Sequence, residues 1–177
     1  IENADYKVVA NIPYYITSHL LRLIFSQKNL PARVVLMIQK EVAERICAKP
    51  PNMNLLALSV QAYGRPKIIF RVSKIFFKPR PKVDSAVIVI DNISRDFFKT
   101  IGTPGVHIGQ EEEKFFELLH AGFRQKRKFL LSNLKNSIPG VEKGMWINGF
   151  GACKISEKAR AENLPLEGWG CLAENIF

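Results

Sequence analysis

The stretch Asn11-Ile12-Pro13-Tyr14 carries residue types that can grip a flat ring with an exocyclic amine. The side-chain carbonyl of Asn11 can accept a hydrogen bond from such an amine. Pro13 biases Ile12 to an extended backbone, which fixes the direction of the Ile12 carbonyl as a second acceptor. Tyr14 offers an aromatic face on which a base can stack. Together these groups predict methyl transfer to the 6-amino group of adenine.

A purely structural interpretation of the same tetrapeptide stays open. It follows the apolar run 8–10, so it can also be a strand that ends in a proline turn, with Tyr14 covering the core. A single short motif does not separate the two interpretations.

Two clusters of cations predict a polyanion as the partner. The formal charge is +10, and residues 65–82 contain no acidic residue. Each phosphate that a cation neutralises releases condensed counterions, so we expect nucleic acid, although a solvated surface is the alternative. Neither cluster forms a long amphipathic helix, which argues against a membrane surface. The expected RNA contacts are Lys78, Arg80, Lys82, Arg124, Lys126, Arg127 and Lys128.

Prolines at alternate positions stiffen the segment 76–85 and favour an extended backbone. The segment presents Phe77 beside three cations, whereas one of Phe76 and Phe77 is expected in the core. The alternative is a rigid connector in which both rings are buried.

The elements that position these residues alternate between strands and helices up to about residue 91 and are helical afterwards. Thr17 or Ser18 is expected to cap the first helix. Residues 33–38 are a continuous apolar run, typical of a strand covered on both faces. The segment Gly149-Phe150-Gly151 is interpreted as a helix terminator. Strands are predicted over 6–10, 33–38, 67–72 and 86–90, and helices over 41–48, 54–62, 111–123 and 126–136, with short helical pieces over 157–163 and 167–176.

The cysteines and histidines are scattered without metal-ligand spacing, so no metal is expected. Cys47, Cys153 and Cys171 are interpreted as free thiols in a reducing compartment, which favours the cytoplasm. No apolar run approaches the roughly 20 residues that cross a bilayer, so no membrane association is expected.

Methyl transfer also needs a cradle for S-adenosylmethionine, which in doubly wound folds is a Gly-rich turn followed by an acidic residue for the ribose. The sequence has no such unit after a strand. Together with a start in mid-strand, this predicts the C-terminal portion of a longer protein, which by itself binds the cofactor poorly or not at all.

Five ordered segments resemble the KsgA-type small-subunit ribosomal RNA adenine dimethyltransferases, relatives of the Erm antibiotic-resistance enzymes. Residues 11–14 resemble the family's Asn-Leu-Pro-Tyr, and residues 77–87 closely resemble its Phe-x-Pro-x-Pro-x-Val-Asp-Ser signature. The stretch 160–164 favours the bacterial general-purpose enzymes over Erm enzymes. The other matching segments are 39–42 and 123–128.

This resemblance implies an α/β fold: the C-terminal half of a Rossmann-like methyltransferase sheet, followed by a small all-α domain. The implied domains are a partial catalytic domain over 1–91, a linker over 92–110 and a helical RNA-binding domain over 111–177. It further implies a monomer that dimethylates two adjacent adenosines of small-subunit rRNA during ribosome assembly, with S-adenosylmethionine as methyl donor.

The resemblance also implies roles for single residues. Asn11 and the Ile12 carbonyl, oriented by Pro13, accept hydrogen bonds from the amine, and Asn11 lies beside the methyl end of the cofactor. Tyr14 and Phe77 sandwich the extruded base. Two other functions stay open: a non-catalytic RNA-binding module for ribosome assembly, and DNA adenine methylation, which often uses Asn/Asp-Pro-Pro-Tyr.

Overall fold

The computed structural model of the chain describes residues 6–101 and 108–177. Its backbone divides into two compact units. The sheet unit consists of Ile1–Ala48 with Tyr63–Ser94, and the helical unit consists of Lys49–Ala62 with Arg95–Phe177.

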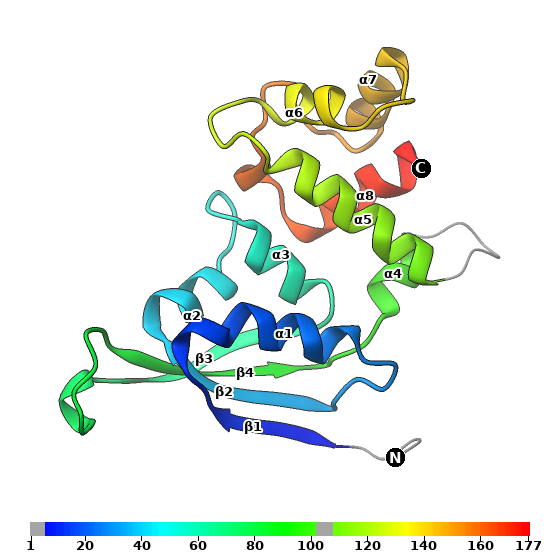
Figure 1. The fold of residues 1–177 in the computed structure, drawn as a ribbon. Coiled ribbons are helices and arrows are strands. Elements are labelled where there is room, and N and C mark those ends of the chain that lie inside the picture. The colour runs from blue at the N-terminus through cyan, green and yellow to red at the C-terminus, as the bar shows by residue number, and fades with distance from the viewer. Residues whose placement is uncertain (1–5, 102–107) are drawn as a thin grey trace. The chain divides into compact units, whose positions relative to one another are not determined.

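A four-stranded mixed sheet forms the centre of the sheet unit (Figure 1). β1 pairs with β2 in parallel, whereas β4 runs antiparallel to both β2 and β3. The strands lie in the order β1 (Lys7–Asn11), β2 (Arg33–Gln39), β4 (Ser85–Asp91) and β3 (Arg65–Val72). All four predicted strands are confirmed, with ends shifted by one or two residues.

The two faces of this sheet are covered differently. Figure 1 shows α1 (Thr17–Ser26) and α2 (Lys40–Ile46) on the same face. Alternate residues of β2 and β4, such as Leu36 and Ile88, are fully buried there. On the opposite face Met37 and its neighbours are half-buried, and neither α1 nor α2, the described α-helices of the sheet unit, covers them. The expectation of a strand covered on both faces is therefore not met within the described residues.

The start of α1 differs from the prediction. Ile16 occupies the N-cap position without a side-chain hydrogen bond, because a 3₁₀ turn, η1 (Tyr14–Ile16), leads directly into the helix. Thr17 Oγ1 instead donates to the carbonyl of Tyr14 at 3.1 Å. The prediction of Thr17 or Ser18 as the cap is wrong.

Aromatic side chains form the core of the helical unit. Phe98, Phe115, Trp146 and Trp169 are fully buried. Residues 102–107 of the predicted linker lie outside the described residues, while its residues 96–100 form a helix that carries Phe98. The helices are α3 (Leu55–Gln61), α4 (Asp96–Thr100), α5 (Ile108–Gly122), α6 (Leu130–Ser137), α7 (Lys143–Ala152), η3 (Ala161–Asn163) and α8 (Leu166–Ile176).

Two predictions about these helices are wrong. Gly149-Phe150-Gly151 lies inside α7 and does not terminate a helix. A Cβ atom on Gly149 would lie 2.8 Å from Ile176 Cδ1, so the glycine permits close packing of α7 against α8. The helix expected from Lys126 begins at Leu130, and residues 124–128 form turns and bends.

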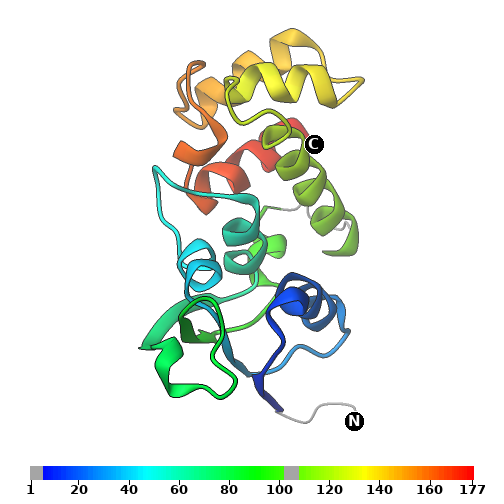
Figure 2. The ribbon, with the colours of Figure 1, turned by 60° about the vertical axis from the view of Figure 1, so that its left-hand side comes forward.

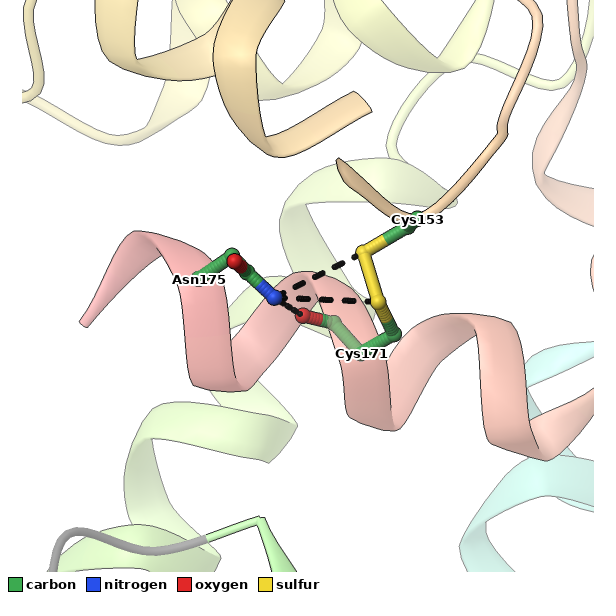
Figure 3. The surroundings of a disulfide bond; sticks show 3 residues. All are labelled: Cys153, Cys171 and Asn175. Atoms are coloured by element: carbon green, nitrogen blue, oxygen red, sulfur yellow. Dashed lines mark hydrogen bonds between the residues drawn. A yellow bond between two sulfur atoms is a disulfide. The ribbon is translucent and has the colours of Figure 1, made fainter. Parts of the chain in front are cut away.

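A disulfide links Cys153, the C-cap residue of α7, to Cys171 in α8 (Figure 3). Asn175 Nδ2 donates to the carbonyl of Cys171 at 2.9 Å beside it. The prediction of free thiols is therefore wrong for this pair, because tertiary packing joins residues that have no local pairing signal. Cys47 is free, and burial raises the pKa of its thiol.

Among the described residues, none of the helices combines the length and the apolar character that spanning a bilayer requires.

Candidate functional site

The tetrapeptide and the proline-rich segment lie at one end of the sheet, where β1 and β2 finish. Asn11, the last residue of β1, lies opposite Met37 near the carboxyl end of β2. Gln39 at that end pairs with Ser85 of β4, which also pairs with Val72 of β3. The loop 73–84 joins β3 to β4, so it emerges at this same end (Figures 1 and 2). Ligands of open α/β sheets commonly bind outside the carboxyl ends of the strands.

The tetrapeptide leaves the sheet with its polar groups accessible. Asn11 is exposed, whereas Ile12 is buried in the core. Pro13 has φ −56° and ψ 134°, an extended conformation, and Tyr14 is half-buried at the start of η1. The amide of Asn11 and part of the Tyr14 ring can therefore contact a ligand.

Tyr14 is held at both ends. Its hydroxyl oxygen lies 2.7 Å from Ser85 Oγ, and either group can be the donor. Its carbonyl accepts the hydrogen bond from Thr17 Oγ1. The ring is thus fixed between η1 and the first residue of β4.

The loop 73–84, here called the proline loop, is closed at its base by Asp84. Asp84 Oδ1 accepts a hydrogen bond from Lys74 N at 3.0 Å, and the Asp84 carbonyl accepts one from Lys40 N at 3.0 Å. Lys74 Nζ donates to the carbonyl of Lys82 at 3.3 Å. These bonds join the two ends of the loop and connect it to the end of β2.

The proline loop presents aromatic and cationic side chains together. Phe76 is 77% exposed and Phe77 is half-buried, so the expectation that one of the two lies in the core is wrong. Lys78, Arg80 and Lys82 are all exposed.

The second predicted cluster, residues 124–128, lies in the helical unit and is here called the basic turn. Its side chains are exposed. Asn133 of α6 is 5% exposed and lies behind it. Its Nδ2 donates to the carbonyls of Gly122 at 2.7 Å and Gln125 at 3.0 Å, which fixes the path of the turn.

A cavity of about 390 Å³ lies beside Asp84 in the sheet unit. None of its lining residues is aromatic, and Glu44 is engaged by Arg71 at 3.3 Å. The cavity therefore lacks a surface on which a base can stack. It is lined by Gln39, Lys40, Glu41, Glu44, Lys74, Val83 and Asp84.

The predicted catalytic residues and the proline-loop cations thus lie at one end of the sheet, at the carboxyl ends of β1 and β2. The remaining predicted cations lie in the helical unit. Sequence reasoning assigned no role to Asp84, Ser85 or Asn133. Asp84 and Ser85 are the Asp-Ser of the family signature in residues 77–87, but the signature does not say which groups they bond to. Asn133 had a weaker signal, a single amide within an apolar helical pattern.

Comparisons with known proteins bear on this arrangement. A family model described as Ribosomal RNA adenine dimethylase matches residues 2–176. The Ribosomal RNA small subunit methyltransferase A of Dehalococcoides mccartyi is 39% identical over 168 residues, which cover 95% of this chain and 54% of that protein. The protein of the same name from Fusobacterium nucleatum is 39% identical over 166 residues, covering 93% and 59%. The chain spans about half the length of these curated relatives.

Solved structures show the same fold. A dimethyladenosine transferase from Plasmodium falciparum superimposes with a TM-score of 0.75 at 25% identity, over 97% of this chain and 66% of that one. The 23S rRNA methyltransferase ErmE gives a TM-score of 0.69 at 18% identity, over 99% and 68%. The α/β fold class and the resemblance carried by the five segments are both confirmed. Since the family match extends over nearly the entire sequence, the chain belongs to the ribosomal RNA adenine dimethylase family.

Proposed function

We propose that the intact protein transfers methyl groups to the 6-amino groups of two adjacent adenosines in small-subunit rRNA during ribosome assembly. The names of the curated relatives and the family match support rRNA as the substrate. The observation that carries the proposal is the exposed Asn11 amide at the carboxyl end of β1. It lies three residues from Tyr14, whose ring is held by a hydrogen bond between its hydroxyl group and Ser85.

The groups of this chain suit an amine that is a weak nucleophile. The lone pair of an adenine amine is delocalised into the ring. Hydrogen bonds to the Asn11 carbonyl oxygen and to the Ile12 carbonyl favour a tetrahedral nitrogen, which returns the lone pair to the nitrogen for attack. Positioning and preorganised dipoles then supply the catalysis, and no general base is required in the motif.

The methyl donor expected for this family is S-adenosylmethionine, which supplies a methyl group on a positively charged sulfur when it is bound. Asn11 is the residue expected beside that methyl group. The described turns that follow β1 and β2 contain no glycine, so neither of these two turns is a Gly-rich cradle for the cofactor's nucleoside. The 177-residue chain by itself is therefore proposed to be inactive.

In this proposal two surfaces of the protein bind the RNA substrate. Tyr14 and Phe77 hold the extruded base, and the proline-loop cations contact the adjacent phosphates. The helical region 111–177, through its basic turn, binds RNA elsewhere along the backbone. This assignment rests on exposure and charge, since the cations of both clusters are exposed.

The test is Asn11→Ala in the intact protein, with incorporation of labelled methyl groups into unmethylated small ribosomal subunits as the readout. We expect methyl transfer to be abolished while RNA affinity stays nearly unchanged, because Asn11 contributes one neutral side chain and no phosphate contact. Asn52→Ala, at another exposed asparagine, is the matched control and should keep full activity. Wild-type turnover by Asn11→Ala would refute the assigned role.

A second function is favoured for the isolated chain by one observation. Both cation clusters are exposed, whereas the described turns that follow β1 and β2 contain no glycine. The 177-residue chain would then bind rRNA without catalysis. Salt-dependent RNA affinity, together with no heat of S-adenosylmethionine binding in calorimetry, is the expected result.

A further inference from the structure

Ser85 carries a polar side chain in a fully buried position. Its relative exposure is 0%, and its Oγ lies 2.7 Å from the hydroxyl oxygen of Tyr14, a residue 71 positions away in the sequence. Buried hydroxyl groups are almost always hydrogen-bonded, because an unpaired one loses its contacts with water. Ser85 is therefore a buried partner for the ring that is proposed to stack on the base.

The position of Ser85 is rigid. It is the first residue of β4 and pairs with Gln39 of β2 on one side and with Val72 of β3 on the other. The preceding residue, Asp84, is bonded through its carbonyl to Lys40 N and through its side chain to Lys74 N. The Ser85 hydroxyl is thus presented by a strand residue that is paired on both sides.

Tyr14 is constrained from its other end as well. Thr17 is 2% exposed, and its hydroxyl donates to the Tyr14 carbonyl. With its backbone and its phenol both bonded, the ring has little freedom to rotate about its side-chain torsions. Tyr15, the next residue of the same turn, is 89% exposed, whereas Tyr14 is half-buried.

We propose that Ser85 is a positioning residue that holds the Tyr14 ring in the orientation that receives the target base. This inference rests on the proposed function. A ring that is already ordered loses less conformational entropy when a base stacks on it, so more of the stacking energy is available for capture. Ser85 acts through Tyr14 and need not touch the RNA.

The experiment compares the intact wild-type protein with Ser85→Ala, Tyr14→Phe and the double variant. Methyl-transfer kcat, KM for unmethylated small subunits and RNA affinity are measured at saturating S-adenosylmethionine. We expect Ser85→Ala to lower kcat about fivefold, the equivalent of one neutral hydrogen bond, with RNA affinity within about twofold of wild type. Tyr14→Phe removes the same bond and should lower kcat similarly, and the double variant should lose no more than either single variant.

Two controls separate positioning from folding. Tyr15→Phe and Ser18→Ala change an exposed hydroxyl in the same segment and should leave kcat and KM unchanged. The melting temperature of every variant is measured, and activity is assayed well below it. If Ser85→Ala does not fold, Tyr14→Phe still tests the bond, because it keeps the ring and leaves Ser85 in place.

The outcomes are distinguishable. A lower melting temperature with unchanged kcat, or kcat losses that add in the double variant, would overturn the positioning role of Ser85 and leave the proposed function standing. An intact wild-type protein without methyl transfer would contradict the proposed function and the inference together. Lower kcat at unchanged RNA affinity, without additivity, supports the inference.

Discussion

The proline loop of the sheet unit and the basic turn of the helical unit are both rich in exposed cations, and in each a polar side chain forms hydrogen bonds to the backbone. Asp84 accepts the Lys74 N–H in the first, and Asn133 donates to two carbonyls in the second. They differ in the rings that accompany the cations. The proline loop includes Phe76 and Phe77, whereas residues 124–128 contain no aromatic residue.

This difference indicates two ways of contacting RNA. Stacking of a base on an aromatic ring is largely independent of salt, whereas contacts between cations and phosphates release counterions and weaken as salt rises. The proline loop is suited to both, whereas residues 124–128 themselves supply only the second. Variants in the two loops should therefore differ in the kind of binding they lose.

The largest expected effect comes from removing the base of the basic turn. Asn133→Leu removes the Asn133 donor from the Gly122 carbonyl and leaves the Gln125 carbonyl with the Lys128 N–H as its remaining donor, which should lower the free energy of unfolding by about 2–3 kcal/mol. Urea denaturation measures this loss. Asn136→Leu, at an exposed asparagine of the same helix, is the control. Unchanged stability of Asn133→Leu would show that the turn does not depend on this side chain.

An intermediate effect is expected at Phe77 of the proline loop. Phe77→Ala in the intact protein should weaken capture of the target adenine by ~1–3 kcal/mol, with the salt dependence of binding unchanged. Fluorescence of 2-aminopurine placed at the target position reports the stacking. Phe76→Ala is the matched comparison, since Phe76 is the more exposed ring. A larger loss in Phe76→Ala would transfer the stacking role to that residue.

The smallest effect at physiological salt is expected for the cations of the basic turn. Replacement of Lys126, Arg127 and Lys128 by Gln should reduce the slope of log affinity against log salt by about one unit per lost phosphate contact. Titrations of rRNA fragments at several salt concentrations give this slope. Three exposed lysines outside the turn, replaced in the same way, provide the control: Lys143, Lys154 and Lys158. An equal change in the control would mean that total charge, and not the turn, sets the affinity.

Much of the fold could be predicted from local patterns. The apolar runs marked all four strands, because a buried strand needs consecutive or alternating apolar residues. The position of α6 was predicted less well. The apolar spacing of Leu130, Leu131 and Leu134 was extended backwards into the cations, whereas the hydrogen bonds of Asn133 hold those residues in a turn.

Contacts between distant residues were not predictable in this way. Cys153 and Cys171 have no motif spacing, and the packing of α7 and α8 brings them together. Gly149 was interpreted as a terminator because glycine is common at helix ends, but it lies inside α7, where a Cβ atom would come within 2.8 Å of Ile176 Cδ1.

The sequence was enough to identify the residues that could bind a substrate or take part in a reaction, because residue type and short spacing determine which groups a segment can offer. These residues are Asn11, Tyr14, Phe77 and the two cation clusters. Only the tertiary structure decided which of these side chains form hydrogen bonds with distant residues, and which residues are their partners. Tyr14 and Ser85 are 71 residues apart, and they meet because β4 inserts between β2 and β3 and presents its first residue to the turn after β1. Hydrogen bonds depend on distance in space, and strand order, which sets that distance, is a property of the whole chain.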